Sequence, residues 1–215
     1  ANLILFNTCT IREKANQKAM SEIGRSLKRK ESHPETLIGV CGCVAQEVRE
    51  KIFSRFPHVD LLFGPDQLYK IPELIQKAAL KQKISSFDLI NNQSEYVFLD
   101  RSISKETSSF VSIMKGCNSA CSYCIVPSVR GREVCRPDIK IIEEIKNLVS
   151  VGVKEVVLLG QNVNSYEYNE TSFAKLIQKI ADETDICRIR FVSPHSKDVK
   201  DDLISEYRTN GKLMP

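Results

Sequence analysis

The sequence lacks any apolar run close to the roughly 20 residues that a helix needs to cross a bilayer, so no membrane-spanning helix is expected. It also has no secretory hydrophobic region at its amino end, no internal repeat and no low-complexity tract. Its eight cysteines, irregularly spaced over 215 residues, are not typical of a disulfide scaffold. We therefore expect a cytoplasmic protein in a reducing compartment, with no membrane partner.

The net charge of +4 is too small to indicate a partner by itself, but the charge is unevenly distributed. Between Arg12 and Lys30 there are seven basic residues and two acidic ones. A basic helix face of this kind can bind the phosphates of RNA, although such a face is more often only solvated. Arg130, Arg132 and Arg136 add further positive charge later in the chain.

The first part of the chain alternates apolar strands with helical patterns. Strands are expected at 3–6, 36–40 and 59–63, and helices at 12–29, 45–56 and 67–83. This alternation predicts an α/β fold with a doubly wound parallel sheet, and we assign residues 1–84 to this domain. Residues 85–106 are polar and irregular and are expected to form a linker.

A second series of strands and helices occupies residues 107–215. Strands are expected at 110–114, 155–159 and 187–192, and helices at 137–151, 171–184 and 198–209. Three successive strand-helix units are typical of the first half of a β/α barrel, whose chemistry takes place at the carboxyl ends of its strands. A full barrel would need more units, and the chain opens directly on a strand, so both ends are expected to be truncated.

Three cysteines, Cys117, Cys121 and Cys124, lie within eight residues and are spaced four and then three apart. Such soft ligands favour zinc, copper or an iron-sulfur cluster. Structural zinc sites usually have four protein ligands, and no second cysteine pair follows here. Three thiolates instead suit a 4Fe-4S cluster with one open iron. A zinc knuckle or three unlinked thiols is the alternative.

This spacing, with Tyr123 before the third cysteine, resembles the cluster loop of the radical S-adenosylmethionine (SAM) superfamily. The resemblance implies that the open iron is chelated by the methionine moiety of SAM and that Tyr123 lies near the adenine. Gln161 and Asn162 follow the next expected strand. We interpret them as candidate polar contacts to this cofactor.

Cys9 and Cys43 form a second candidate site. Each follows an expected strand of the first sheet, and the carboxyl ends of parallel strands lie side by side, so the two cysteines could meet although they are 34 residues apart. Two thiolates are too few for a cluster. Buried core cysteines are therefore the alternative at this point.

Residues 6–15 and 38–46 resemble the amino-terminal domain of the radical SAM methylthiotransferase family, and residues 114–133, 158–166 and 189–195 resemble its radical domain. The resemblance implies two 4Fe-4S clusters. Cys117, Cys121 and Cys124 would hold the radical-generating one. Cys9 and Cys43 would be two of the three ligands of an auxiliary cluster, whose third ligand is expected upstream of Ala1. The other cysteines, Cys41, Cys135 and Cys187, match no ligand and are expected to be structural.

The segment Cys9–Ala15 resembles the version of this motif that is typical of the family branch that modifies isopentenylated adenosine. The resemblance thus implies a tRNA methylthiotransferase that adds a methylthio group to C2 of N6-isopentenyladenosine next to the anticodon, with tRNA and an electron donor such as a flavodoxin as partners. The alternatives are action on threonylcarbamoyladenosine in tRNA or on a ribosomal protein, a zinc-stabilised nucleic-acid-binding module, and an inactive fragment.

Overall fold

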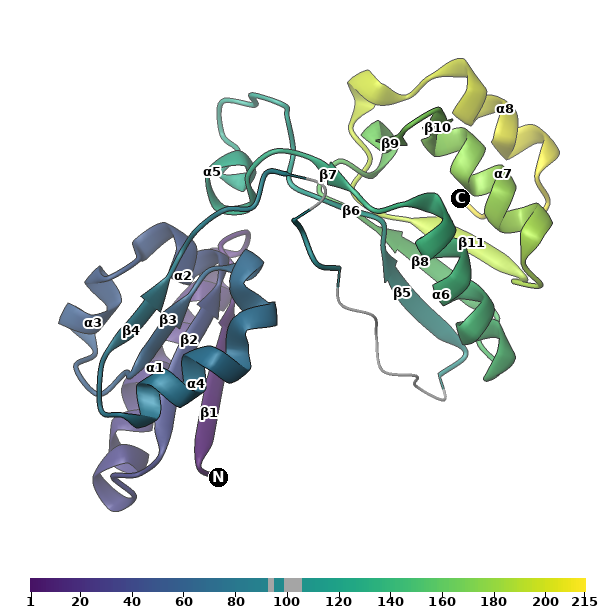
Figure 1. Ribbon diagram of the computed structural model, residues 1–215. Coiled ribbons are helices and arrows are strands. Elements are labelled where there is room, and N and C mark those ends of the chain that lie inside the picture. The colour runs from purple at the N-terminus through teal and green to yellow at the C-terminus, as the bar shows by residue number, and fades with distance from the viewer. Residues whose placement is uncertain (93–94, 99–105) are drawn as a thin grey trace. The chain divides into compact units, whose positions relative to one another are not determined.

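The computed structural model describes residues 1–92, 95–98 and 106–215 (Figure 1). The contacts between residues divide the chain into two compact units. The first contains residues 1–90 and 120–130, and the second contains residues 91–119 and 131–215. Each unit is built around its own parallel sheet, with a hydrophobic core on each face of the sheet in the first unit and one core in the second.

The first unit carries a four-stranded parallel sheet. Its strands, in spatial order, are β1 (Leu3–Thr8), β2 (Leu37–Gly42), β3 (Leu61–Phe63) and β4 (Ile84–Ser86). In β2, Ile38 and Val40 belong to one core and Cys41 to the other, because neighbouring residues of a strand point to opposite faces. Burial on both faces explains why β2 is apolar along its length.

Helices cover both faces of this sheet. The helical segments are α1 (Glu13–Ser32), α2 (Cys43–Val48), α3 (Lys51–Arg55), η1 (Pro65–Lys70), α4 (Ile71–Ala79) and α5 (Val126–Arg130). One face packs against α1 and α3 through Ile23 and Ile52, and the other packs against α4 through Leu74. The strand order follows the chain, without the reversal that a complete doubly wound sheet shows.

Three local features of this unit differ from the sequence-based expectations. The helix expected at 45–56 is interrupted at Arg49, whose φ of 54° is incompatible with a continuous right-handed helix. The helix expected at 67–83 starts as the 3-10 segment η1 and ends at Ala79. Strand β4 reaches into the expected linker, residues 85–106, part of which lies outside the described residues.

The second unit is organised around a three-stranded parallel sheet. Its strands, in spatial order, are β5 (Ser108–Ser112), β8 (Glu155–Leu159) and β11 (Arg188–Phe191). Three consecutive parallel strands joined by helices are the arrangement expected for the first half of a β/α barrel. The strand at 155–159 begins and ends where the sequence predicts.

The helices of this unit cover its sheet and build its core. Its longer helices are α6 (Asp138–Ser150), α7 (Phe173–Glu183) and α8 (Asp201–Thr209). In α6, Ile141, Ile145 and Leu148 recur at helical spacing and are buried, and they share a core with Val156 of the sheet and Leu176 of α7. The short elements are β6 (Met114–Lys115), β7 (Val134–Cys135), η2 (Val163–Ser165), β9 (Glu167–Tyr168), β10 (Thr171–Ser172) and η3 (Ser196–Asp198).

Within the described part of the chain, no helix combines the length and the apolar character needed to cross a bilayer.

Candidate cluster-binding and cofactor site

The cysteine loop runs between the two antiparallel strands β6 and β7, which bring its ends together. Gly116 has a φ of 76°, and a Cβ there would lie 2.0 Å from the carbonyl oxygen of Arg132. Only glycine fits this close backbone approach. The Cys117 N–H donates to the carbonyl oxygen of Gly131 at 3.2 Å, so the first cysteine is fixed at the base of the loop.

Asn118 and Glu133 reinforce this base. The Asn118 backbone N–H and its side-chain Nδ2 donate to the two carboxylate oxygens of Glu133 at 3.1 and 3.2 Å. The Glu133 N–H donates in return to Asn118 Oδ1 at 3.2 Å. Sequence reasoning missed both residues, because nothing in their spacing indicates that they meet.

Gln161 follows β8 and contacts the same loop. Its Oε1 accepts a hydrogen bond of 2.6 Å from the Gly116 N–H, next to Cys117. In this structure Gln161 therefore holds the start of the cysteine loop. A contact with the cofactor remains a prediction for this side chain.

Asn162 is 1% exposed, and its Nδ2 donates to Asp198 Oδ2 at 2.7 Å. Among the described residues, no donor reaches Asn162 Oδ1. A buried acceptor left without a donor costs about 1–3 kcal/mol, so the position favours a ligand that supplies an N–H or O–H group. This orphaned oxygen fits the predicted contact with the cofactor.

The segment that follows β11 contacts the segment that follows β8. The His195 N–H donates to Asn164 Oδ1 at 2.7 Å, and Asn164 Nδ2 donates to the His195 carbonyl oxygen at 2.9 Å. The Val163 N–H donates to the Ser193 carbonyl oxygen. Polar groups following β8 and β11 are thus joined at the carboxyl edge of the sheet, where chemistry is expected in this fold.

The three cysteines of the loop are divided between the two units. Cys117 is buried in the second unit and accepts a 3.4 Å hydrogen bond at its Sγ from the Ser119 N–H. Cys121 and Cys124 belong to the first unit, where a Cys124 N–H to Cys121 carbonyl bond of 3.0 Å places them in one turn. Tyr123, between them, is 90% exposed and available to a ligand.

Cys9 and Cys43 follow adjacent strands in register. Thr8 pairs with Gly42 as the last pair between β1 and β2, and each cysteine is the first residue after its strand. Gly42 has a φ of 92°, and a Cβ on it would lie 2.3 Å from the Thr8 carbonyl oxygen, so glycine is required where the strands end. The prediction that the two cysteines follow adjacent strand ends is confirmed.

The remaining cysteines have different environments. Cys41 and Cys135 are buried, and this burial raises the pKa of each thiol to about 11. Both therefore stay protonated near neutral pH, as expected of core residues. Cys187 is exposed, so the burial expected of a structural cysteine is wrong for this residue.

The chemistry of the donor set fits iron-sulfur clusters, because no disulfide joins the cysteines of the described residues and Fe-S clusters bind through cysteine sulfur. Among the described residues, however, no three cysteine, histidine, aspartate or glutamate side chains are gathered closely enough to hold a metal ion. The cluster assignments of Cys9, Cys43, Cys117, Cys121 and Cys124 therefore remain predictions.

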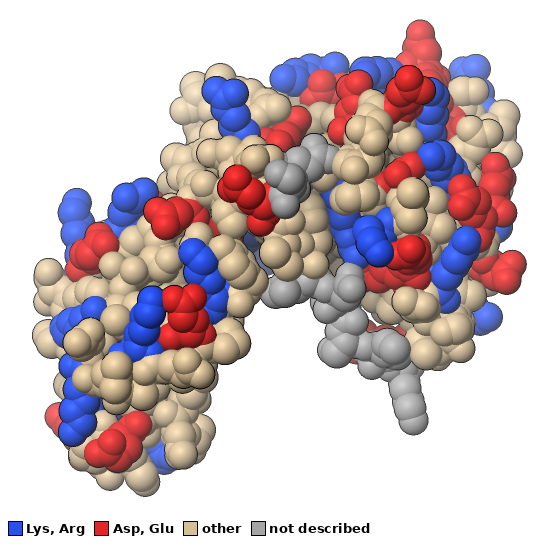
Figure 2. All heavy atoms as spheres, viewed as in Figure 1, with Lys and Arg blue, Asp and Glu red and all other residues tan. Residues whose placement is uncertain are grey.

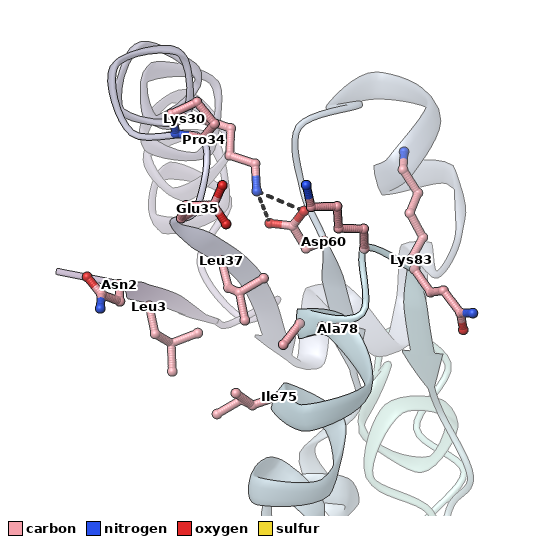
Figure 3. Close-up of a pocket in the computed structure, with 13 residues that line it drawn as sticks. Asn2, Leu3, Lys30, Pro34, Glu35, Leu37, Asp60, Ile75, Ala78 and Lys83 are labelled. Atoms are coloured by element: carbon pink, nitrogen blue, oxygen red, sulfur yellow. Dashed lines mark hydrogen bonds and ion pairs between the residues drawn. The ribbon is translucent and has the colours of Figure 1, made fainter.

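A cavity of about 540 Å³ lies at the opposite end of the first sheet (Figure 3). Leu3 and Leu37, which line it, stand at the amino ends of β1 and β2. The Lys30 ammonium and the Asp60 carboxylate point toward each other there, 2.7 Å apart, so they neutralise each other. Ligands of parallel α/β sheets bind at the carboxyl ends of the strands, so this cavity is no candidate for the cofactor site.

The basic helix α1 is partly neutralised. Arg25 pairs with Glu22 at 2.6 Å, and Lys30 pairs with Asp60. On the face shown in Figure 2, basic and acidic side chains of the first unit are interspersed. Two of the seven basic residues of this segment are thus paired with acidic ones, and RNA binding by α1 remains a prediction.

The fold and the cysteine loop define the class of the second unit, and the model of the radical SAM superfamily matches residues 111–214. The model of the uncharacterized protein family UPF0004 matches residues 1–64. Two solved structures show the same fold. They are the radical SAM methyltransferase TsrM from Kitasatospora setae (TM-score 0.57, 12% identity, 94% of this chain and 46% of that one) and the cobalamin-dependent radical enzyme OxsB (TM-score 0.54, 14% identity, 88% and 30%).

Curated relatives narrow the class. The chain is similar to proteins named tRNA-2-methylthio-N(6)-dimethylallyladenosine synthase from Syntrophotalea carbinolica (40% identity, 99% of this chain and 50% of the relative), Trichlorobacter lovleyi (44%, 99% and 50%) and Myxococcus xanthus (42%, 100% and 47%). It spans about half the length of these relatives. The chain belongs to the radical SAM methylthiotransferase family.

Proposed function

We propose that the protein to which this chain belongs adds a methylthio group to C2 of N6-isopentenyladenosine next to the anticodon of tRNA. The observation that carries the proposal is the 40–44% identity, over essentially the whole chain, to relatives named for this product. The string Cys9–Ala15, which resembles the branch specific for isopentenylated adenosine, favours this substrate over threonylcarbamoyladenosine or a ribosomal protein.

We assign residues 1–84 to the methylthiotransferase amino-terminal domain, 85–106 to a linker and 107–215 to the radical SAM core. The family-model matches at 1–64 and 111–214 support this division. The contacts add one refinement, because residues 120–130 of the cysteine loop group with the amino-terminal unit.

In this proposal Cys117, Cys121 and Cys124 hold one 4Fe-4S cluster, and Cys9 and Cys43 supply two ligands of a second. Sulfur insertion at an unactivated aromatic C–H bond needs radical chemistry that no side chain can perform, and the clusters together with SAM supply it. The residues of the chain bind and orient these groups.

Three side chains have positioning roles in this proposal. Gln161 holds the Gly116 backbone and thereby the first cysteine. Asn162 offers its unpaired Oδ1 to a donor group of SAM. Tyr123 covers the adenine with its exposed ring.

Two partners complete the proposal. The tRNA substrate places the reaction in the cytoplasm. The reduced cluster needs a one-electron donor, and a small protein such as a flavodoxin fits that role.

The test uses the protein extended to the length of its relatives, reconstituted without oxygen and incubated with SAM, a reductant and tRNA. We expect methylthiolation of isopentenylated tRNA and no product on tRNA without the isopentenyl group, both measured by mass spectrometry of digested tRNA. A Cys117→Ala variant is the control and should give no product. Product only on threonylcarbamoylated tRNA would overturn the substrate assignment. Bound zinc without visible absorption would overturn the assignment of the protein as a radical SAM enzyme.

We expect the 215-residue chain alone to give no product, because about half the length of its relatives lies outside it. Product from this chain would show that the remaining half is dispensable.

A further inference from the structure

Arg130 makes an unexpected contact with a predicted cluster ligand. It ends α5, the short helix that follows Cys121 and Cys124, and its Nε donates to Cys43 Sγ at 3.2 Å. Both residues belong to the amino-terminal unit. Cys43 itself is only 7% exposed. A side chain next to the radical-cluster cysteines therefore contacts a cysteine of the auxiliary site.

The physical consequence depends on what Cys43 holds. A thiolate in a buried position is costly unless a donor or an opposite charge compensates it. A guanidinium supplies both, because it is always charged and only donates. Hydrogen bonds to the sulfurs are among the factors that set the reduction potential of Fe-S clusters. Stabilising the extra negative charge of the reduced cluster raises that potential.

We propose that Arg130 is a positioning residue of the auxiliary cluster, which fixes the Cys43 sulfur and raises the reduction potential of the cluster bound through it. This inference rests on the proposed function, since it takes Cys43 as a ligand. The contact also links the two predicted clusters, because Arg130, at the end of the segment that carries Cys121 and Cys124, contacts a predicted ligand of the other cluster.

The neighbouring arginines show that this role is specific to one of them. The sequence groups Arg130 with Arg132 and Arg136 as possible RNA contacts. In the structure, Arg136 is buried and pairs with Glu144, whereas Arg132 is exposed. Arg132→Met therefore removes the same charge two residues away without removing a contact with Cys43.

The experiment uses the protein at the length of its relatives, with Cys117, Cys121 and Cys124 replaced by alanine so that only the auxiliary cluster is loaded. Arg130→Met, Arg130→Lys and Arg132→Met are compared in this background. The readouts are iron and sulfide content, circular dichroism as a check of folding, and the reduction potential from a redox titration followed by electron paramagnetic resonance.

We expect a lower potential in Arg130→Met, a smaller decrease in Arg130→Lys, which keeps the charge but not the planar donor, and no change in Arg132→Met. A folded, loaded Arg130→Met protein with the parental potential overturns the inference. If Arg130→Met does not retain the cluster, the Arg130→Lys variant decides, and a parental potential there overturns the inference too. If the parent lacking the three loop cysteines binds no iron, the assignment of Cys43 as a ligand fails first and the inference falls with it.

Discussion

Asn118 and Glu133, fifteen residues apart in the chain, are joined by three hydrogen bonds across the base of the cysteine loop. Two of the bonds end on the Glu133 carboxylate, and one of these starts from the backbone N–H next to Cys117. The loop therefore has a fixed base before any metal binds. Preorganisation of this kind reduces the entropy that cluster binding would otherwise cost.

Replacing Glu133 by alanine tests this role. The variant loses both bonds to the carboxylate, each worth about 1 kcal/mol, so we expect it to lose iron several-fold faster than the parent when challenged with a chelator. Glu143→Ala is the matched control, because Glu143 pairs only with the exposed Lys140 on α6 among the contacts described. Equal rates of iron loss in the two variants would contradict a role for the Asn118–Glu133 hydrogen bonds in retaining the cluster.

Gln161 gives a second test, which separates a role in holding the loop from a contact with the cofactor. Gln161→Ala removes the acceptor of the Gly116 N–H, whereas Gln161→Glu keeps an oxygen in its place. We expect cluster retention to fall in the alanine variant and to be preserved in the glutamate variant, measured as iron per chain after gel filtration. The opposite result, with normal iron content but weakened SAM binding in both variants, would indicate that Gln161 acts on the cofactor instead.

The fold could be predicted wherever an apolar pattern is long or clear. The strand at 155–159 is correct to the residue, because four consecutive apolar residues, 156–159, lie between the charged Glu155 and Gly160. Strand β4 was missed because its Ile-Ser-Ser sequence carries a single apolar residue. The break at Arg49 was missed because a positive φ at a non-glycine residue has no clear sequence signal.

The candidate site could be predicted from the sequence only in part. Cysteine spacing and strand ends identified where Cys9 and Cys43 lie, since parallel pairing places equivalent positions side by side. Contacts between specific side chains, such as Arg130 with Cys43, depend on how a loop folds back on a sheet. Neither periodicity nor composition carries that information, so these contacts required the structure.

The loop cysteines are expected to act as one set. Replacing Cys117, Cys121 or Cys124 singly by alanine should abolish the broad visible absorption of the reconstituted radical cluster, because three thiolates are the minimum for this site. The measurement is an absorption spectrum together with iron content, in a background that lacks Cys9 and Cys43. Cys187→Ala is the control, since that thiol is exposed and matches no ligand. Unchanged iron in Cys121→Ala would exclude this loop as the cluster site.

Cys41 and Cys43 lie two residues apart but should behave differently. In the protein at the length of its relatives, Cys43→Ala and Cys9→Ala should each lower the iron content to about half, because one of two Fe-S clusters is lost. Cys41→Ala should keep the iron and lower stability instead, since Cys41 packs with Leu61 and Leu74 in the core. Iron loss in Cys41→Ala, with full iron in Cys43→Ala, would show that the ligand positions are misassigned.

Cys135 provides a test of the core that needs no cluster. Burial raises its pKa to about 11, so the folded state holds the thiol proton more tightly than the unfolded state does. The stabilisation is complete below the ordinary thiol pKa near 9 and is lost as the pH rises to about 11, because the unfolded chain ionises first. Urea titrations of the metal-free 215-residue chain should therefore show a steeper loss of unfolding free energy over this range than a Cys135→Ala variant shows.

At about pH 8, iodoacetamide should modify the exposed Cys187 and spare Cys135 until the chain unfolds, because only an accessible thiolate reacts. Equal modification of Cys135 and Cys187 in the folded chain would show that Cys135 is not buried as the structure describes.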